Sequence, residues 1–321
     1  MRVMGMKRAS PCQTVRGAAA LPGARRARCA RGRGLGAGAR SARLAAAAAT
    51  DGLPSLLLFD CDGVLVETEK DGHRVAFNEA FRKIGVPDAI VWDVDLYGEL
   101  LEVGGGKERM KHDFSNRIAA GDTELEAFVS SKGGLDALAK ELHAIKTDIM
   151  FDMVSANQMP PRPGIPRLIG EAAAANVRMA ICSTSNEKAV RAVLKSVLES
   201  KPDVGISLDE IPIFAGDVVP RKKPDPAVYE LAAQELLGSG WSDLTDTCVV
   251  VEDSRIGAQA AKSAGMRCIV TKSIYTESER FDDIQPTVNA IFDMVGDGSD
   301  SRFSMQDLAL ESAFWETNKV A

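Results

Sequence analysis

Short apolar runs alternate with amphipathic stretches from residue 55 onward, and this alternation limits the possible folds more than any other feature. Five runs have the length and composition of strands: Ser55–Asp60, Val177–Ser183, Ile213–Ala215, Cys248–Glu252 and Met266–Thr271. Helical patterns lie between the later runs, at Glu187–Leu198, Pro226–Leu237 and Arg255–Ala264. Strands that alternate with helices of this length indicate βαβ units and a parallel sheet covered on both faces. The sequence therefore predicts an α/β fold.

A long interval after the first predicted strand carries helical patterns alone. Apolar residues recur at helical spacing in Ala76–Ile84, Leu96–Val103, Glu108–Ala119 and Leu125–Leu142. The turn-forming run Pro160–Gly164 then precedes the return of the alternation. We predict an inserted α-helical cap over 68–160, an α/β core built from 51–67 and 161–296, and a loosely ordered tail over 297–321.

The first 50 residues differ in composition from the rest of the chain. They hold eleven of the 39 Lys and Arg residues, none of the 45 Asp and Glu residues, and many Ala and Gly residues. We predict an organelle transit peptide over 1–50; a disordered basic arm that binds nucleic acid is the alternative. Residues 51–321 carry a net charge of −17, which opposes binding to nucleic-acid phosphates. The sequence lacks an apolar run long enough for a membrane span, so we predict neither nucleic acid nor membrane as a partner of the core.

Polar residues follow four of the predicted strands, at the point where each strand ends. In open parallel sheets, ligands bind beyond these carboxyl ends. The residues concerned are Asp60 and Asp62 after the first strand, Ser183, Thr184, Ser185 and Asn186 after the second, Lys223 in the loop after the third, and Glu252 and Asp253 after the fourth. The fold thus predicts that carboxylates, a hydroxyl and an ammonium group meet at one place.

These residue types suit phosphoryl transfer. Several carboxylates on one edge repel one another unless a hard cation such as Mg²⁺ lies among them. An aspartate nucleophile divides hydrolysis into two easier steps, and a second aspartate two residues later can serve as general acid and base. Lys223 and the Ser183 hydroxyl can stabilise phosphate oxygens. Each residue alone also has a structural explanation, as a turn residue, a helix cap or a solvated charge; their joint occurrence after separate strands favours catalysis.

Four segments resemble the motifs of the haloacid dehalogenase superfamily: FDCDGVLVETE, AICSTSN, RKKPDP and VVVEDSRIGAQAAKSAG. The resemblance implies a Rossmann-like core with an inserted helical cap. It also implies that Asp60 is the nucleophile, that Asp62 is the general acid and base, and that Ser183 and Lys223 bind phosphate. Magnesium would be held by Asp60, by the Asp62 backbone carbonyl, and by Asp253 together with Glu252.

The cap carries a Gly run before a helix, with Lys107 and Arg109 beyond it. By itself this run is either a clamp for a second phosphate or sugar hydroxyls, or a flexible loop with solvated charges. The segments VGGGKERM and STSNEKAV look like the CbbY-type branch of the superfamily. That resemblance implies hydrolysis of xylulose-1,5-bisphosphate, an inhibitor of Rubisco, to xylulose 5-phosphate, and a chloroplast stroma location. It places substrate contacts at Glu67, Tyr97, Lys107 and Arg109, with Ser183, Thr184, Ser185, Asn186 and Lys223 in the core.

Two points stay open in this interpretation. The hinge Glu69–His73 is one residue longer than in phosphoglucomutase-like members of the superfamily, which leaves the placement of His73 uncertain. A sugar-phosphate mutase shares every core motif with a phosphatase, and a non-catalytic sugar-phosphate-binding protein would keep the same fold. Intact Asp60 and Asp62 argue against the non-catalytic alternative. The sequence leaves the oligomeric state undetermined, with a monomer as one option.

Overall fold

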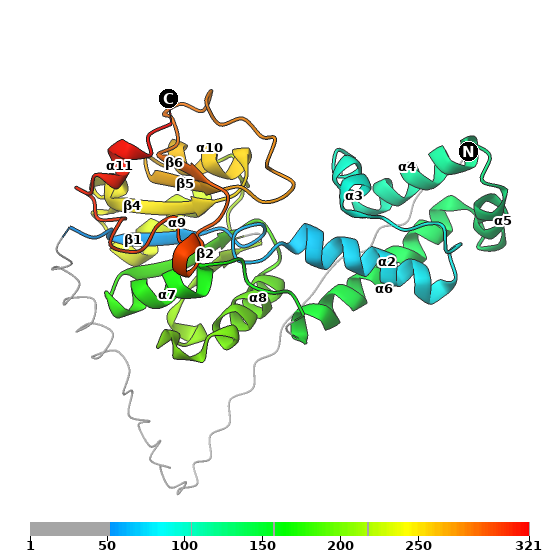
Figure 1. Cartoon of the computed structure of the whole chain (residues 1–321), viewed down its shortest axis with the longest axis horizontal. Helices are drawn as coiled ribbons and strands as arrows, with labels where there is room; N and C mark the ends of the chain where they lie inside the picture. Colours follow the sequence, from blue (N-terminus) through cyan, green and yellow to red (C-terminus); the bar gives the residue numbers. More distant parts are fainter. Residues whose placement is uncertain (1–51, 104, 157, 217, 321) are drawn as a thin grey trace, which may run out of the picture. The chain divides into compact units, whose positions relative to one another are not determined.

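The computed structural model describes residues 52–103, 105–156, 158–216 and 218–320. The predicted transit peptide, 1–50, lies outside the described residues. A six-stranded parallel sheet forms the core, with strand order β3-β2-β1-β4-β5-β6 (Figure 1). The strands are β1 (Leu56–Phe59), β2 (Arg178–Ser183), β3 (Ile213–Ala215), β4 (Cys248–Glu252), β5 (Arg267–Thr271) and β6 (Ala290–Phe292). The predicted α/β class is confirmed, and all five predicted strands are present; β6 was not predicted.

The two faces of the sheet are covered by different helices. Alternate residues of β1 point to opposite faces, so Leu57 and Phe59 join one buried cluster and Leu56 and Leu58 join another. Helices α7 (Ile165–Ala174) and α8 (Glu187–Ser200) pack in the first cluster, and α9 (Ala227–Leu237) and α10 (Arg255–Ser263) in the second. Burial on both faces explains why β1 is apolar throughout.

The strand order places a reversal beside β1. The chain adds β2 and β3 on one side of β1 and then β4, β5 and β6 on the other. Ligands bind at such a switch point, outside the carboxyl ends of the strands. Here that point lies between the ends of β1 and β4, which carry Asp60 and Glu252.

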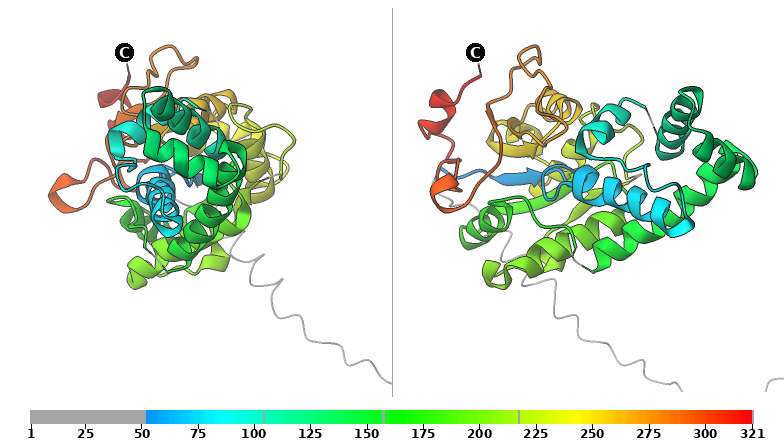
Figure 2. Two further views of the ribbon diagram at one scale, coloured as in Figure 1. Left: turned by 90° about the vertical axis from the view of Figure 1, so that its right-hand side faces the viewer. Right: turned by 45° about the vertical axis from the view of Figure 1, so that its right-hand side comes forward.

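The predicted cap region consists of helices, as expected. After the loop 60–67 that follows β1, a π-helical turn, η1 (Thr68–His73), leads into α2 (Arg74–Ile84), blue and cyan in Figure 2. Four further helices follow: α3 (Val94–Leu100), α4 (Gly106–Ala119), α5 (Thr123–Ser131) and α6 (Leu135–Ser155). Their apolar side chains form a third buried cluster, rich in aromatic rings such as Phe77, Trp92 and Tyr97.

One helix prediction in this region was wrong. The pattern Leu125–Leu142 suggested a continuous helix, whereas the structure divides it into α5 and α6. Gly133 and Gly134 both have positive φ, 82° and 97°, a conformation that ends a helix and that glycine adopts without steric cost. Periodicity alone misses this break because apolar residues continue at helical spacing on both sides of it.

The C-terminal segment was predicted to be loosely ordered, and for residues 297–320 this was wrong. Phe303, Leu308 and Trp315 are buried in the first core cluster, and α11 (Phe314–Thr317) ends this segment. Arg167 on α7 donates to the carbonyl oxygens of Gly296 and Phe303. The prediction rested on the polar run at 296–301 and did not take account of the aromatic residues that follow it.

Short 3₁₀ turns lie between the main elements, at Pro202–Val204, Leu208–Glu210, Trp241–Asp243, Thr245–Thr247 and Gly298–Asp300. None of the described helices combines the length and apolarity that crossing a membrane requires.

Candidate active site

Lys223 lies between two carboxylates at the carboxyl ends of the strands. Its Nζ is 2.5 Å from Asp60 Oδ1 and 2.7 Å from Glu252 Oε1, and it also donates to the Cys182 carbonyl oxygen at 2.8 Å. Burial alone lowers the pKa of this lysine, but Asp60 and Glu252 outweigh burial and raise it above its ordinary value. The ammonium group therefore stays charged and joins the ends of β1, β2 and β4.

Glu252 is fully buried, and both of its oxygens accept hydrogen bonds. Oε1 accepts from Lys223 and from the Tyr229 hydroxyl, and Oε2 accepts from the backbone N–H of Asp253 at 3.2 Å. A Cβ added at Gly257 would lie 2.0 Å from this carboxylate, so α10 can pack here only with glycine at that position. These contacts fix the position of Glu252. Glu252 in turn helps to fix Lys223, which donates to it.

Three carboxylates form a group that could hold a metal ion. Oxygen atoms of Asp60, Glu252 and Asp253 lie within 4.8 Å of one another, and all three residues are buried. Gly63, with φ of 77°, passes so close to Asp253 that an added Cβ would be 2.1 Å from Oδ2. An all-oxygen donor set of this charge suits a hard divalent cation such as Mg²⁺. The donors therefore fit the predicted ion.

Two of these carboxylates have pKa values raised far above the ordinary 3.8. Burial raises the pKa of Asp60 to about 7, against the lowering effect of Lys223, and the charges of Glu252 and Asp62 add to the rise. Burial, Glu252 and Asp60 raise the pKa of Asp253 as well. Burial and the crowding of negative charges raise both pKa values, and a bound cation counteracts these effects by stabilising the carboxylate forms.

Asp62 faces the end of β2. Its Oδ2 accepts from the Ser185 hydroxyl at 2.6 Å and lies 3.4 Å from the Ser183 hydroxyl, which in turn accepts from the Ser185 N–H. The same loop presents Thr184 as an exposed residue, and the Asn186 side chain caps α8 by accepting from the Lys188 N–H at 3.0 Å. The structure thus brings Asp62, Ser183 and Ser185 together.

The cap contributes a second polar group. The Tyr97 hydroxyl donates to Glu69 Oε2 at 2.6 Å and accepts from Arg109 Nη1 at 3.2 Å. Tyr97 is fully buried, Arg109 is partly buried, and Lys107 is exposed in the first turn of α4. Three predicted substrate contacts therefore lie on one part of the cap, with Tyr97 and Arg109 in direct contact.

Lys146 on α6 is a site candidate that the sequence did not reveal. Its Nζ lies 2.8 Å from His73 Nδ1 and 4.9 Å from the centre of the Phe77 ring. Burial lowers the pKa of Lys146 to about 8, and burial together with Lys146 lowers that of His73. The charges of Glu69 and Asp62 act against this lowering of the His73 pKa, so both carboxylates lie within electrostatic range of the imidazole. A lysine within a helical pattern gives no sequence signal of this kind.

Glu67, another predicted substrate contact, pairs with a buried arginine. Arg162 Nε is 3.1 Å from Glu67 Oε1, and the same guanidinium donates to the carbonyl oxygens of Gly63, Thr271, Lys272 and Asp293. Arg162 thereby joins the loop after β1 to the ends of β5 and β6. In the sequence it stood out only as part of the turn at Pro160–Gly164.

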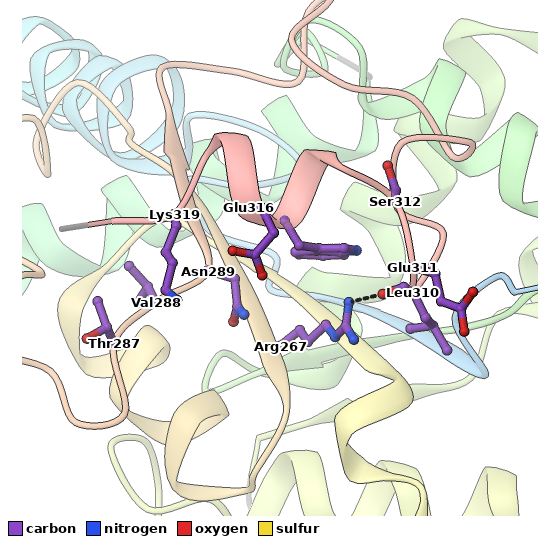
Figure 3. A pocket seen from close by; sticks show the side chains of 10 residues that line it. Arg267, Thr287, Val288, Asn289, Leu310, Glu311, Ser312, Glu316 and Lys319 are labelled. Atoms are coloured by element: carbon purple, nitrogen blue, oxygen red, sulfur yellow. Dashed lines mark hydrogen bonds between the residues drawn. The ribbon is translucent and has the colours of Figure 1, made fainter.

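A cavity of about 360 Å³ lies elsewhere, near the amino ends of β5 and β6 (Figure 3). Arg267 and Trp315 line it, with the guanidinium 4.8 Å from the ring centre, and so do Asn289 and Lys319. None of the predicted site residues belongs to the described lining of this cavity.

Comparison with known proteins places the chain in a family. A family model described as haloacid dehalogenase-like hydrolase matches residues 54–265. A CBBY-like protein of Arabidopsis thaliana is 47% identical over 258 residues, which are 79% of this chain and 73% of that protein. Protein CbbY of Cereibacter sphaeroides is 37% identical over 229 residues, covering 70% of this chain and 87% of the relative.

A solved structure agrees. The crystal structure of a CbbY mutant from Rhodobacter sphaeroides in complex with xylulose-(1,5)bisphosphate has a TM-score of 0.51 and 34% identity, and the match covers 75% of this chain and 95% of that one. The family-model match spans Asp60, Ser183, Lys223 and Asp253. The chain belongs to the haloacid dehalogenase-like hydrolases and, among them, to the CbbY-like proteins, and it is a phosphatase.

Proposed function

We propose that this phosphatase is magnesium-dependent and hydrolyses a sugar bisphosphate, xylulose-1,5-bisphosphate, to xylulose 5-phosphate and inorganic phosphate. The observation that carries the proposal is the buried arrangement of Asp60, Lys223 and Asp253 at the switch point of the sheet, below a cap with cationic side chains. The related CbbY structure in complex with xylulose-(1,5)bisphosphate supports the choice of substrate.

The first step forms an aspartyl phosphate. An oxygen of Asp60 attacks the C1 phosphorus, and the bond between phosphorus and the C1 oxygen breaks. The electron pair leaves with that oxygen, which takes a proton from the Asp62 carboxyl group. Lys223 and the Ser183 hydroxyl stabilise the phosphoryl oxygens, on which negative charge is spread in the transition state.

The second step releases phosphate and restores the enzyme. Asp62, now a carboxylate, removes a proton from water, and the water oxygen attacks phosphorus. The bond between phosphorus and Asp60 breaks, so Asp60 regains its carboxylate. Ser185, which donates to Asp62 at 2.6 Å, orients this side chain for both transfers.

For the metal we propose direct coordination by the side chains of Asp60 and Asp253 and by the Asp62 backbone carbonyl. Magnesium, when bound, neutralises carboxylate and phosphate charge so that the anionic substrate can approach Asp60. Glu252 belongs to the same acidic group, but its oxygens already accept from Lys223, Tyr229 and the Asp253 N–H. We therefore assign Glu252 the role of holding Lys223 in place, with any contact to the ion secondary.

Specificity for a bisphosphate is proposed to come from the cap. Residues 51–321 carry a net charge of −17, so a doubly phosphorylated sugar needs a local excess of cations. Lys107, Arg109 and Lys146 supply three such groups from α4 and α6. We propose that they bind the distal phosphate. Tyr97 and Glu67 then act on the sugar indirectly, through Arg109 and Arg162, the side chains that they contact. The acid-free leader and the Arabidopsis relative support a chloroplast location.

A phosphate-release screen tests the proposal. Purified protein is incubated with Mg²⁺ and a panel of sugar mono- and bisphosphates, and both inorganic phosphate and the sugar product are quantified. We expect the highest kcat/KM for xylulose-1,5-bisphosphate, with one phosphate released per xylulose 5-phosphate formed. Isomerisation without phosphate release would indicate a mutase, and binding without turnover would indicate a sugar-phosphate-binding protein.

A further inference from the structure

The turn Lys272–Thr276, which follows β5, is fixed to the core by several contacts. Arg162 Nη2 donates to the Lys272 carbonyl oxygen at 2.7 Å. The Ser273 N–H donates to Thr276 Oγ1 at 2.9 Å, and the Ser273 side chain is near enough to Asp253 to lower the pKa of that carboxyl group. The Ile274 backbone N–H likewise lowers the pKa of Glu67. The turn therefore has a position set by the same residues that form the candidate active site.

Tyr275 extends from this turn to the cap. Its ring centre is 5.9 Å from that of Tyr97, with an angle of 59° between the ring planes. A Cβ added at Gly98 on α3 would lie 3.3 Å from two carbons of the Tyr275 ring, so the ring is packed against the α3 backbone. This geometry lies within the range of favourable aromatic pairs. Tyr275 is a core residue that packs against the buried cluster of the cap.

Tyr97, whose ring packs against Tyr275, also holds the polar side chains Glu69 and Arg109 of the cap. Tyr97 donates to Glu69 and accepts from Arg109, and the Arg109 guanidinium carbon lies 5.7 Å from the Tyr97 ring centre. A displacement of Tyr97 would therefore move Arg109 and Glu69 with it. The chain of contacts runs from the core turn through two aromatic rings to a cation of the cap.

The Tyr275 hydroxyl does not take part in this packing. Within the described residues it is buried and has no hydrogen-bond partner. Removing it breaks no hydrogen bond to the described residues, and a buried polar group without a partner is unfavourable. Tyr275→Phe is therefore a matched control that keeps the ring and its contacts.

We propose that Tyr275 is a positioning residue that sets the place of α3, and with it Arg109, over the active site. The role rests on the proposed function, because Arg109 is there assigned to the distal phosphate. The contact between Tyr275 and α3 itself does not depend on which substrate the enzyme uses.

Steady-state kinetics test the role with Tyr275→Ala and Tyr275→Phe. For xylulose-1,5-bisphosphate, Tyr275→Ala should raise KM about tenfold, as expected for the loss of an aromatic contact of about 1–1.5 kcal/mol. Its kcat/KM for p-nitrophenyl phosphate, which lacks a distal phosphate, should stay within about twofold of wild type. Tyr275→Phe should match wild type with both substrates. Equal loss with both substrates, or an unchanged KM in Tyr275→Ala, would overturn the role.

A double-mutant cycle with Gly98→Ala tests the contact directly. The added methyl group pushes against the Tyr275 ring, so the single Gly98→Ala variant should also raise KM for the bisphosphate. In the Tyr275→Ala background the same change should have little further effect, because the ring is gone. Additive effects would show that Gly98 and Tyr275 act separately and would reject the proposed chain of contacts.

Hydrogen exchange gives a readout without substrate. Tyr275→Ala should increase amide exchange in residues 94–100 and leave exchange in β1 and β4 unchanged. Unchanged exchange in α3 overturns the positioning role whatever the substrate. If no sugar bisphosphate is hydrolysed while α3 exchanges faster in Tyr275→Ala, the proposed function fails and the structural role of Tyr275 stands.

Discussion

Asp60, Lys223 and Glu252 form a buried ionic group in which each charge depends on the others. Lys223 contacts both carboxylates, and its side chain is 4% exposed. The ammonium raises the tendency of Asp60 to ionise, whereas burial and Glu252 oppose it. Asp60 can act as a nucleophile only as a carboxylate. Lys223 favours that form by lowering the pKa of Asp60, even before a phosphate is bound.

Substitution of Lys223 should affect activity and stability together. Lys223→Met keeps the length of the side chain but leaves Asp60 and Glu252 without their shared cation. We expect kcat/KM to fall by at least about a thousandfold and the free energy of unfolding by about 3–5 kcal/mol. Lys195→Met, which changes an exposed lysine on α8, is the control and should leave both values near wild type. Phosphate release and urea denaturation measure the two effects; a stable, active Lys223→Met enzyme would contradict the assignment.

Arg109 should discriminate between one and two phosphates. Its guanidinium lies in the cap beside Tyr97 and Glu69. Arg109→Ala should raise KM about tenfold or more for xylulose-1,5-bisphosphate and much less for a sugar monophosphate, because a charge-assisted hydrogen bond is lost from one substrate alone. Lys111→Ala, on the same helix, is the matched control. Equal increases for both substrates would remove the distal-phosphate assignment.

The meeting of the proposed catalytic residues at one place could be predicted because parallel strands align their carboxyl ends. Asp60 and Asp253 each follow a strand directly and Ser183 is the last residue of β2, so recognising the strands was enough to bring them together. The partners of these residues could not be predicted. Tyr229 and Lys146 lie inside helices, where a tyrosine or a lysine fits equally well on a buried or an exposed face. Their contacts depend on how whole helices pack.

At the scale of secondary-structure elements, Arg162 joins more segments than any local pattern suggests. One guanidinium bonds the loop after β1, the Glu67 carboxylate and the ends of β5 and β6. Burial lowers the pKa of Arg162, and Glu67 counteracts this effect. The segment that precedes η1 is therefore held by a residue that lies just before α7.

Loss of Arg162 should cost far more than loss of an exposed ion pair. Arg162→Met removes the partner of Glu67 and of four carbonyl oxygens, and we expect the free energy of unfolding to fall by about 3–5 kcal/mol. Arg302→Met breaks an exposed bidentate pair with Asp293 and should change it by about 0–1 kcal/mol. Urea denaturation compares the two. Similar values for both variants would mean that the Arg162 contacts contribute little.

The elements themselves were predictable to the extent that their signals are local. Strand β1 is apolar throughout and β4 is apolar up to its last residue, Glu252, and both were predicted within two residues of their observed limits. The edge strand β6, three residues long, was not predicted; it pairs with β5 in parallel at the edge of the sheet. The division between α5 and α6 depends on the backbone of two glycines, and the sequence pattern does not reveal their φ angles.

At the scale of the whole molecule, stability should depend on pH and magnesium together. The pKa of Asp60 is about 7 in the folded state and near 3.8 otherwise. As pH rises from about 4 to about 7, the unfolded chain loses this proton first, so the contribution of Asp60 favours unfolding increasingly and levels off above about pH 7. Magnesium binds the carboxylate form and should reverse this loss.

Scanning calorimetry with Mg²⁺ and with a chelator checks this linkage. We expect the gain in Tm from Mg²⁺ to be larger at pH 8 than at pH 5.5. Asp253→Asn should abolish most of the gain, because one of the two proposed carboxylate ligands is lost. A gain that is equal at both pH values, or unaffected by Asp253→Asn, would contradict the proposed coordination.

Asp60 is proposed to carry the phosphoryl group during turnover, and acid-quench mass spectrometry tests this claim by detecting the covalent phosphate. The enzyme is mixed with xylulose-1,5-bisphosphate and Mg²⁺, stopped with acid within one turnover, digested and analysed by peptide. We predict one phosphoryl group on the peptide that contains Asp60, and none in Asp60→Asn, which should also lose phosphate release. Phosphate release at the wild-type rate by Asp60→Asn, or a phosphoryl group on a different residue, would contradict the claim.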